Sequence, residues 1–350
     1  MSLSFASILQ FHRERYPAMQ PQDFGKLAYQ SEFGPEHLVS DRTAVQQALF
    51  REWETLAPDV CAPAPDPLGN GLSRFHLDYR LGTASTVPLL ADLVLRTAAA
   101  HHGSADGLAR RLDALSPLPI PGMAGWVAAY RAQGCPPPRH SEAFRAAYRP
   151  HYRLLRTSYA GYFPALLSVQ RLTQSGRPAI VAVDGRCGSG KTGFARLLQE
   201  LFPCRVVHMD DFYLPFDQRP PDWAEQPAGN MDLSRFREEV LVPLRAGGSA
   251  IYRPYSCQTG QMLAPETLAP APLTIVEGSY SLHPSLSGFY DLRLFLTCSG
   301  EAQARRLQAR EGAHYAAFQE RWIPFEERYF QRYRVASGSD MMLDTSAFFL

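Results

Sequence analysis

A chain of 350 residues is longer than one hydrophobic core usually organises, so we expect two domains. With 35 basic against 34 acidic residues and a net charge of +1, the composition argues against nucleic acid or an anionic membrane as partner and favours a small molecule. The six cysteines form no C-x-x-C pair, which argues against a disulfide framework or a cysteine-based zinc site. The sequence shows neither a secretory signal nor an apolar run long enough to span a membrane, so a cytoplasmic location is expected.

The first part of the chain, residues 1–172, is predicted to be a mainly α-helical N-terminal domain, and its role is unknown. Apolar residues recur at three- and four-residue spacing in 37–56, 87–100 and 141–152, which predicts helices. Ser141 is a candidate N-cap for the last of these. The stretch 72–81 has the alternating pattern of a strand.

A polar segment, 173–177, follows the apolar-rich stretch 163–172 and predicts a domain boundary, so the second domain is 173–350. Beyond it, strand-like runs alternate with helical stretches that begin at Lys191 and span 233–244. The strand-like runs are 179–183, 205–209, 273–276 and 292–297. Such alternation predicts an α/β domain in which helices cover a parallel sheet.

Residues 185–192 form a complete G-x-x-x-x-G-K-T motif between a strand-like run and a helical stretch. Glycines let the backbone turn tightly and point its N–H groups at phosphate oxygens. The motif therefore predicts a nucleotide-binding loop made of Gly185, Arg186, Cys187, Gly188, Ser189, Gly190, Lys191 and Thr192. Together with the alternating strands and helices, it predicts the three-layer α/β fold of P-loop NTPases with its parallel sheet. Lys191 is expected to reach the β- and γ-phosphates and Thr192 to ligate Mg²⁺, with a chance match in a glycine-rich turn as the alternative.

Three acidic residues follow two of the predicted strands. Asp210 and Asp211 directly follow the run 205–209, and Glu277 directly follows the run 273–276. In open α/β sheets ligands bind at the carboxyl ends of the strands. Phosphoryl transfer needs a carboxylate that takes the proton of an acceptor hydroxyl, and a second acid can serve a metal ion. Asp211 and Glu277 are candidate metal ligands, while a solvated turn or a capping carboxylate is the alternative role for these acids.

These motifs, in this order, resemble the uridine kinase and phosphoribulokinase family over 178–350. The resemblance rests on the P-loop with Asp184 before it, on Met-Asp-Asp-Phe-Tyr at 209–213 and on Ile-Val-Glu-Gly-Ser-Tyr at 275–280. It implies ATP and Mg²⁺ as cofactors, Asp210 as the base and Glu277 as a magnesium ligand. Residues 303–310 resemble the family's arginine-bearing lid helix, which implies a catalytic Arg306 and a nucleotide-binding Arg310. A solvated basic face is the alternative for this helix.

The acceptor side departs from the family pattern. Classical uridine kinases have a His-Pro-Asp segment where this chain has Ala228-Gly229-Asn230, and usually an Asp where Ser256 stands. Asp232 is a candidate N-cap for the following helix. The segment 321–330 is predicted to be a closing helix with Pro324 near its first turn, which supplies packing and no catalytic group.

The sequence therefore predicts an ATP-dependent phosphotransferase with an alcohol acceptor, namely a nucleoside-like molecule or another small metabolite. The alternative is a nucleotide-binding regulatory module without phosphotransfer. The chain lacks the N-K-x-D and L-S-G-G-Q signatures, which lowers the GTPase and ABC-ATPase interpretations. The N-terminal domain could cover the acceptor pocket, recognise a larger substrate or mediate self-association into a homo-oligomer.

Overall fold

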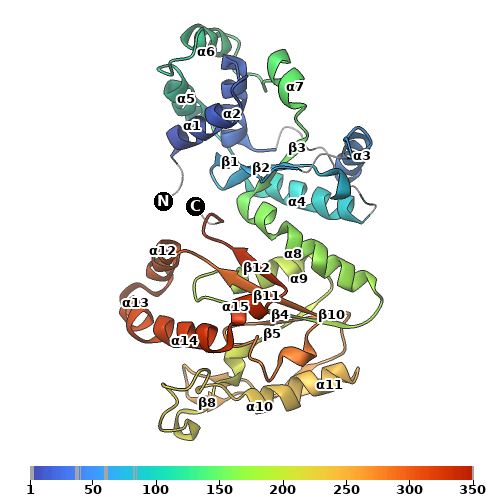
Figure 1. The fold of residues 1–350 in the computed structure, drawn as a ribbon, viewed down its shortest axis with the longest axis vertical. Coiled ribbons are helices and arrows are strands. Elements are labelled where there is room, and N and C mark those ends of the chain that lie inside the picture. Colours follow the sequence, from blue (N-terminus) through green and yellow to red (C-terminus); the bar gives the residue numbers. More distant parts are fainter. Residues whose placement is uncertain are drawn as a thin grey trace. The chain divides into compact units, whose positions relative to one another are not determined.

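The computed structural model describes residues 4–35, 39, 41–58, 62–81, 83 and 85–348. The chain forms two compact units (Figure 1): an N-terminal unit, Met1–Gly161 with Ala347–Leu350, and a P-loop unit, Tyr162–Ser346. The expected boundary, after residue 172, falls inside helix α8 (Thr157–Gln174). The division lies earlier because apolar side chains of α8 pack within the P-loop unit; the ring of Tyr162 lies 4.5 Å from that of Phe194.

Helices make up most of the N-terminal unit, as the spacing of its apolar residues predicts. They are α1 (Phe5–Arg15), α2 (Pro21–Phe33), α3 (Arg42–Trp53), α4 (Thr86–Ala100), α5 (Ala105–Leu115), α6 (Met123–Ala132) and α7 (Glu142–Tyr148). The predicted helices 37–56, 87–100 and 141–152 correspond to α3, α4 and α7, although residues 37, 38 and 40 lie outside the described residues. Ser141 caps α7 as expected, because its hydroxyl accepts a hydrogen bond from the amide of Phe144 at 3.1 Å.

A three-stranded antiparallel sheet, only partly predicted, completes the N-terminal unit. Strand β2 (Leu72–His76) lies in the stretch with alternating character and pairs with β1 (Asp66–Gly69) and β3 (Tyr152–Arg156). A 3-10 helix, Tyr79–Leu81, follows β2. The sequence did not reveal β1, which lies in a proline-rich stretch, or β3, whose first residue continues the helical spacing of α7.

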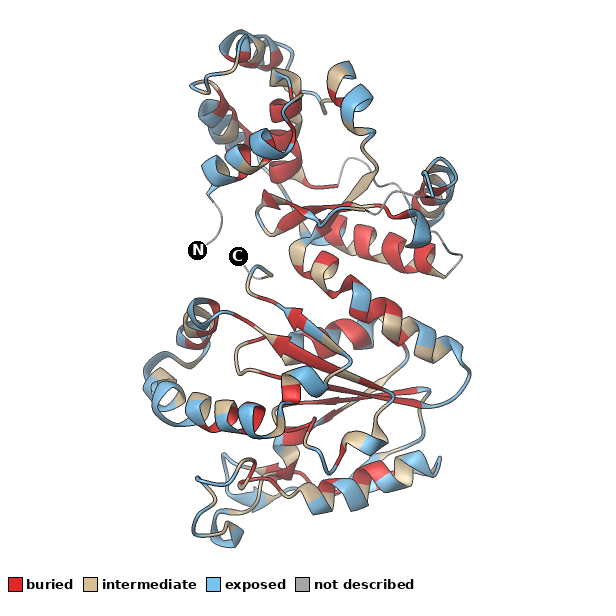
Figure 2. Ribbon diagram, in the orientation of Figure 1, coloured by how far each residue is buried: buried red, intermediate tan, exposed pale blue. Residues whose placement is uncertain are grey.

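The P-loop unit contains the parallel sheet that the sequence predicts. Its strands are β4 (Ala179–Gly185), β5 (Arg205–His208), β10 (Leu273–Glu277), β11 (Leu292–Thr297) and β12 (Met341–Asp344), in the order β12-β11-β4-β10-β5. All four neighbouring pairs are parallel. Every residue of β4 and β10 is buried (Figure 2), as expected of strands covered by helices on both faces. Only β12 had no counterpart in the sequence prediction.

Helices surround this sheet, and two pairs of consecutive helices are joined by a π-helical turn. They are α9 (Lys191–Leu201), α10 (Leu233–Phe236), α11 (Val242–Arg245), α12 (Gly300–Glu311), α13 (Tyr315–Ala317), α14 (Ile323–Tyr333) and α15 (Val335–Gly338). The predicted helix 233–244 is α10 and α11 joined by a π turn, Arg237–Leu241, and a second π turn, Phe318–Trp322, precedes α14. Pro243 and Pro324 follow these turns, and a proline has no amide to donate to the preceding turn.

Short strands lie outside the main sheet. Strand β6 (Ala250–Tyr252) pairs with β9 (Glu266–Leu268), and β7 (Tyr255–Ser256) pairs with β8 (Gln261–Met262). The remaining 3-10 helices of the described chain are Met209–Phe212, Phe216–Gln218, Ser287–Phe289 and Gly312–His314.

Two observations concern the whole described chain. None of its helices is long and apolar enough to cross a membrane. The thiols of Cys135, Cys187, Cys204, Cys257 and Cys298 are free, and the sixth cysteine, Cys61, lies outside the described residues.

Candidate functional site

The loop between β4 and α9 has the backbone shape that its glycines predict. Gly185, Gly188 and Gly190 have φ angles of 138°, 74° and 94°. A Cβ atom at Gly185 would lie 1.9 Å from the carbonyl oxygen of Leu296 on β11, so only glycine fits there. Helix α9 begins at Lys191, directly after the loop. The backbone N–H groups of its first turn have no partner within the helix and therefore favour a bound phosphate.

A buried carboxylate holds the start of the loop. Asp184 accepts hydrogen bonds from the amides of Gly185 at 2.7 Å and Leu282 at 3.0 Å and from the hydroxyl of Tyr329 at 2.8 Å. Burial raises the pKa of this carboxyl group, and the hydrogen bonds oppose that shift. Asp184 therefore fixes the backbone of the loop and contributes no accessible group to the site.

Lys191 lies where the motif predicts, with its ammonium group on the carbonyls of its own loop. Its Nζ donates to the carbonyl oxygens of Gly185 at 2.7 Å and Arg186 at 3.2 Å, and it lies 3.5 Å from the hydroxyl of Ser279. An anion bound in the loop would offer this ammonium group a stronger, charge-assisted partner than a neutral carbonyl.

The predicted magnesium ligands Thr192 and Glu277 come together. The hydroxyl of Thr192 lies 3.3 Å from one carboxylate oxygen of Glu277 and 3.4 Å from the other. A third side chain, His208, joins Thr192 and Glu277, and no sequence motif pointed to it. Its Nδ1 lies 2.7 Å from a carboxylate oxygen of Glu277. The hydrogen bond to Glu277 raises the pKa of His208. His208 lies opposite Glu277 in the β5–β10 register, which only the sheet reveals.

The chemistry of this pair fits a magnesium ion. Mg²⁺ prefers oxygen ligands and is usually held by one or two protein groups together with phosphate and water oxygens. Thr192 and Glu277 supply a hydroxyl and a carboxylate. Over the part of the chain that the structure describes, no group of three or more His, Cys, Asp or Glu side chains is arranged to hold a metal ion by itself.

Asp210 follows β5 in the 3-10 helix Met209–Phe212, and the residue as a whole is exposed. Desolvation nevertheless raises the pKa of its carboxyl group, and a hydrogen bond with the Tyr213 hydroxyl opposes this shift. The positive charge of Lys191 opposes this shift, whereas the negative charge of Glu277 adds to it. Asp210 is therefore electrostatically coupled to both the P-loop lysine and the strand-end glutamate.

The neighbouring acid, Asp211, has a different environment. Its carboxylate accepts a hydrogen bond from the hydroxyl of Tyr252 at 3.2 Å, and the same hydroxyl donates to Glu266 at 3.1 Å. No hydrogen bond in the described chain joins Asp211 to Thr192 or Glu277, so we leave it out of the proposed metal ligands.

The two lid arginines have different partners. Arg306 donates to the carbonyl oxygen of Gly188 in the loop and to the hydroxyl of Thr345, both at 3.1 Å. It therefore joins α12 to the loop backbone. Arg310 contacts its neighbour Glu311 at 2.5 Å and is largely exposed, and within the described chain no hydrogen bond or ion pair joins it to the loop.

Helix α14 supplies two loop contacts that sequence reasoning missed. Arg186 pairs with Glu327, with an Nε–Oε1 distance of 2.6 Å. The amide of Cys187 donates to both carboxylate oxygens of Glu326, at 2.9 and 3.1 Å. Gln303 donates to the carbonyl oxygen of Cys187 at 3.0 Å. The residues after Gly185 are thus held by side chains from α12 and α14.

A signal for Glu326 was present in the sequence. Helix α14 begins at Ile323 with Pro324 in its first turn, as predicted, and buries Phe325, Tyr329 and Phe330. Glu326 occupies the same buried face, where a glutamate needs hydrogen-bond partners. Burial raises its pKa. The expectation that this helix only packs was therefore incomplete, because Glu326 also contacts the loop.

On the acceptor side, the altered segment lies beside the acidic turn. Met231 forms a β-bridge with Tyr213, and the amide of Leu214 donates to the carbonyl of Asn230 at 2.8 Å. Asn230 is buried, and neither its side-chain oxygen nor its nitrogen has a hydrogen-bond partner in the described structure. Asp232 caps α10 as expected, accepting from the amide of Arg235 at 3.0 Å.

The parallel sheet and its loop define a P-loop phosphate-binding domain. Comparisons with known proteins show which P-loop proteins the chain resembles. No family model matches the chain. Over 140 residues it is 28% identical to phosphoribulokinase of Synechocystis sp., a match that covers 37% of this chain and 41% of the relative. The chain thus matches less than half the length of that curated relative.

Solved structures similar to the chain have low identity. A possible uridine kinase from Bacillus stearothermophilus is 19% identical with a TM-score of 0.40, and the match covers 52% of this chain and 100% of that one. A protein assigned as a fructose transport system kinase of Silicibacter sp. TM1040 is 22% identical with a TM-score of 0.39, covering 47% and 89%. The phosphoribulokinase match confirms the resemblance to uridine kinase and phosphoribulokinase that the motifs indicate. What the site does must be inferred from its own residues.

Proposed function

We propose that the P-loop unit binds ATP with Mg²⁺ and transfers the γ-phosphoryl group to a hydroxyl group of a small molecule, with Asp210 as the base. Lys191 and the loop amides bind the phosphates, and Thr192 and Glu277 hold the metal ion. Arg306 positions the loop, because it donates to the carbonyl oxygen of Gly188 and to the hydroxyl of Thr345.

The convergence of three strand ends carries this proposal. Strand β10 lies between β4 and β5, and both pairings are parallel, so the carboxyl ends of all three strands meet at one edge. The loop with Lys191 follows β4, Glu277 ends β10 and Asp210 follows β5. A phosphate-binding lysine, a metal-binding acid and a second carboxylate at one edge are the groups that phosphoryl transfer needs.

The environment of Asp210 suits a base. Its raised pKa gives the carboxylate a higher proton affinity than an ordinary aspartate, while exposure lets an acceptor reach it. Lys191 would leave the carbonyl of Gly185 for phosphate oxygens. When bound, the metal ion would neutralise charge on the phosphates.

Asn230 supports a polar acceptor. A buried amide without hydrogen-bond partners is unfavourable, and a hydroxyl-bearing ligand or a water molecule could satisfy it. The names of the similar proteins suggest three acceptor classes to test, namely nucleosides, sugars and sugar phosphates. Nucleosides are our first choice because of the uridine kinase resemblance.

The test compares Asp210→Asn with Asp211→Asn in the full chain. ATP consumption with Mg²⁺ would be measured across these acceptors, with mass spectrometry of the products and a separate measurement of nucleotide binding. We expect Asp210→Asn to lower turnover by about 10²–10⁴-fold while nucleotide affinity changes little, because the base acts in the transition state. Asp211→Asn is the matched control and should retain most of the turnover, since its carboxylate bonds to Tyr252.

Two results would contradict the proposal. Loss of turnover in Asp211→Asn with activity retained in Asp210→Asn would show that Asp211, and not Asp210, is the base. Tight ATP binding without phosphorylation of any acceptor would favour a nucleotide-binding regulatory module.

A further inference from the structure

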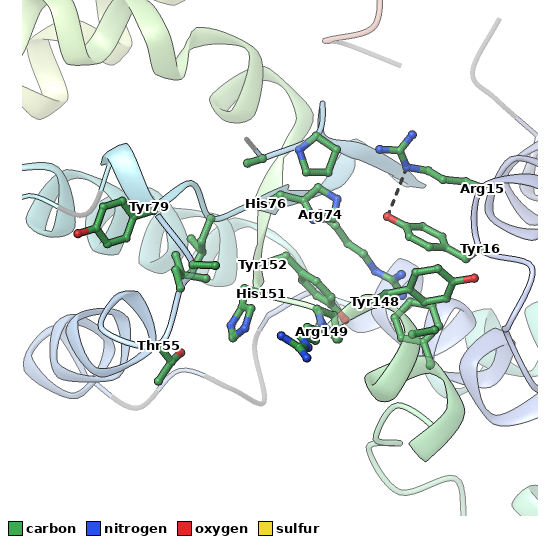
Figure 3. Close-up of a pocket in the computed structure, with 18 residues that line it drawn as sticks. Arg15, Tyr16, Thr55, Arg74, His76, Tyr79, Tyr148, Arg149, His151 and Tyr152 are labelled. Atoms are coloured by element: carbon green, nitrogen blue, oxygen red, sulfur yellow. Dashed lines mark hydrogen bonds between the residues drawn. The ribbon is translucent and has the colours of Figure 1, made fainter. Parts of the chain in front are cut away.

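The N-terminal unit contains a pocket of about 490 Å³ with an unusual set of side chains (Figure 3). Eighteen described residues line it, from α1, β2, α7, β3 and the connections between them. They include three arginines, two histidines and four tyrosines, but neither an aspartate nor a glutamate. Its size is that of a small-molecule site, and its ionisable groups favour a negatively charged occupant.

Arg74 on β2 is the central observation. Its side chain lines the pocket although the residue is only 1% exposed. Its Nε and Nη2 donate to the side-chain oxygen of Gln30 at 3.0 and 2.8 Å, and its guanidinium lies 4.9 Å from the centre of the Tyr152 ring. Both partners are neutral. No carboxylate in the described chain pairs with Arg74, and its Nη1 makes no hydrogen bond there.

The nearest buried acid of the sheet is already engaged. Asp66 lies opposite Arg74 in the β1–β2 register, but its carboxylate contacts Arg15 at 3.0 Å, Tyr16 at 2.6 Å and His76 at 2.9 Å. A buried guanidinium without a counter-charge is strongly unfavourable unless an anion joins it. Among the described residues, therefore, no carboxylate forms an ion pair with Arg74, although Asp66 lies opposite it on the neighbouring strand.

Neighbouring groups respond to the positive charge of Arg74. Burial, and then the charge of Arg74, lowers the pKa of Lys26 to about 8. The pKa of His140 is lowered to about 4, mainly by burial. The charge of Arg74 also lowers it, whereas the hydrogen bond to Asp23 raises it. The interior behind the pocket thus disfavours further positive charge.

The remaining walls supply a second cation and aromatic surfaces. Arg149 ends α7 with a φ of 42°, is exposed, and has no side-chain partner among the residues that the structure describes. Phe144, Tyr148 and Tyr152 also line the pocket. Aromatic rings offer flat apolar contact to the body of a ligand whose charged end meets an arginine.

We propose that this pocket binds a small organic anion, with a carboxylate or phosphate group on Arg74 and an apolar or aromatic body against the rings of α7 and β3. Arg149 would make a second, outer contact with the anionic group. The site lies wholly within the N-terminal unit and does not depend on the function proposed for the P-loop.

The experiment uses the full chain with phenyl phosphate, benzoate and uncharged phenol as probes, followed by calorimetric titration and thermal unfolding. We expect at least one anion to bind and to raise the unfolding temperature, and phenol to do neither. Binding of phenyl phosphate alone would indicate a phosphate ligand, and binding of benzoate a carboxylate ligand. Lys191→Met must leave this binding unchanged, which separates the pocket from the P-loop.

Arg74→Met should weaken binding at least tenfold, because a charge-assisted contact is lost. Without ligand it should unfold no earlier than the wild type, since an apolar side chain removes an unpaired buried charge. Arg149→Ala changes an exposed residue and should weaken binding about twofold to fivefold. Arg153→Met is the matched control: Arg153 lies on the same sheet but already pairs with Glu52 at 2.6 Å, so anion binding should persist.

The inference is overturned if neither anion binds, if binding survives both Arg74→Met and Arg149→Ala, or if it disappears in Lys191→Met. It also fails if Arg74→Met unfolds early while no probe stabilises the wild type, because Arg74 would then serve only the fold. Should Arg74→Met not fold, Arg149→Ala decides by the same titration.

Discussion

Replacing Gly185 with alanine tests how closely the P-loop lies against the sheet. The new Cβ would meet the Leu296 carbonyl oxygen at 1.9 Å and would have to move roughly 1.5 Å to reach the 3.4 Å of ordinary contact. Neither side can move freely, because Gly185 pairs with Leu296 between β4 and β11 and the Arg186 amide donates to the same oxygen at 3.1 Å. The φ of 138° adds backbone strain.

Overpacking and strain together should lower the free energy of unfolding by about 3–5 kcal/mol. For a unit of this size the loss lowers the unfolding temperature by roughly 6–20 °C, measurable by scanning calorimetry. Gly193→Ala is the matched control, since a Cβ there meets nothing within 4 Å and the residue lies in α9. It should raise the unfolding temperature by about 2–4 °C, because alanine favours a helix by about 1 kcal/mol. A Gly185→Ala protein that unfolds within two or so degrees of the wild type would refute this account of the loop.

Two further predictions concern charges. Folding lowers the pKa of Lys26 from 10.5 to about 8, so the wild type should gain stability as pH rises from 8 to 10.5, where only the unfolded chain keeps its proton. Lys26→Met should remove that gain in denaturant unfolding, and parallel pH profiles for the two proteins would contradict the assignment. The side chains of Arg186 and Glu327 are about one-third exposed, so a double-mutant cycle should give a coupling energy of only about 0.5–1 kcal/mol. A coupling energy near 3 kcal/mol would mean that solvent screens the pair far less than its exposure indicates.

The P-loop unit could be predicted largely because its signals are local. A buried strand, a glycine-rich turn and a helix follow one another within 179–201, so the sequence shows the whole phosphate loop. Strand β12 could not be found in this way, because its four residues gain their place only by pairing with β11. Strands β1 and β3 likewise depend on partners far away in the chain.

The same difference between local and distant signals decides which parts of the candidate site could be predicted. Asp210 and Glu277 are recognisable because each follows a strand, and position at a strand end is a local property. The side-chain directions are not local. Asp211 differs from Asp210 by one residue yet bonds to Tyr252, and Arg306 reaches the loop backbone. Only the packed structure decides which polar groups a side chain meets.

Buried charges in the two units provide a final comparison. In the P-loop unit, Asp184 accepts two amides and a tyrosine hydroxyl, and Glu326 accepts the Cys187 amide through both oxygens. Each carboxylate thus has the hydrogen bonds that make its burial tolerable. Arg74 of the N-terminal unit differs, because it is equally buried but has one neutral amide oxygen and one ring as partners. Among the described residues no carboxylate pairs with Arg74, and this contrast with Asp184 and Glu326 supports the external anion proposed for its pocket.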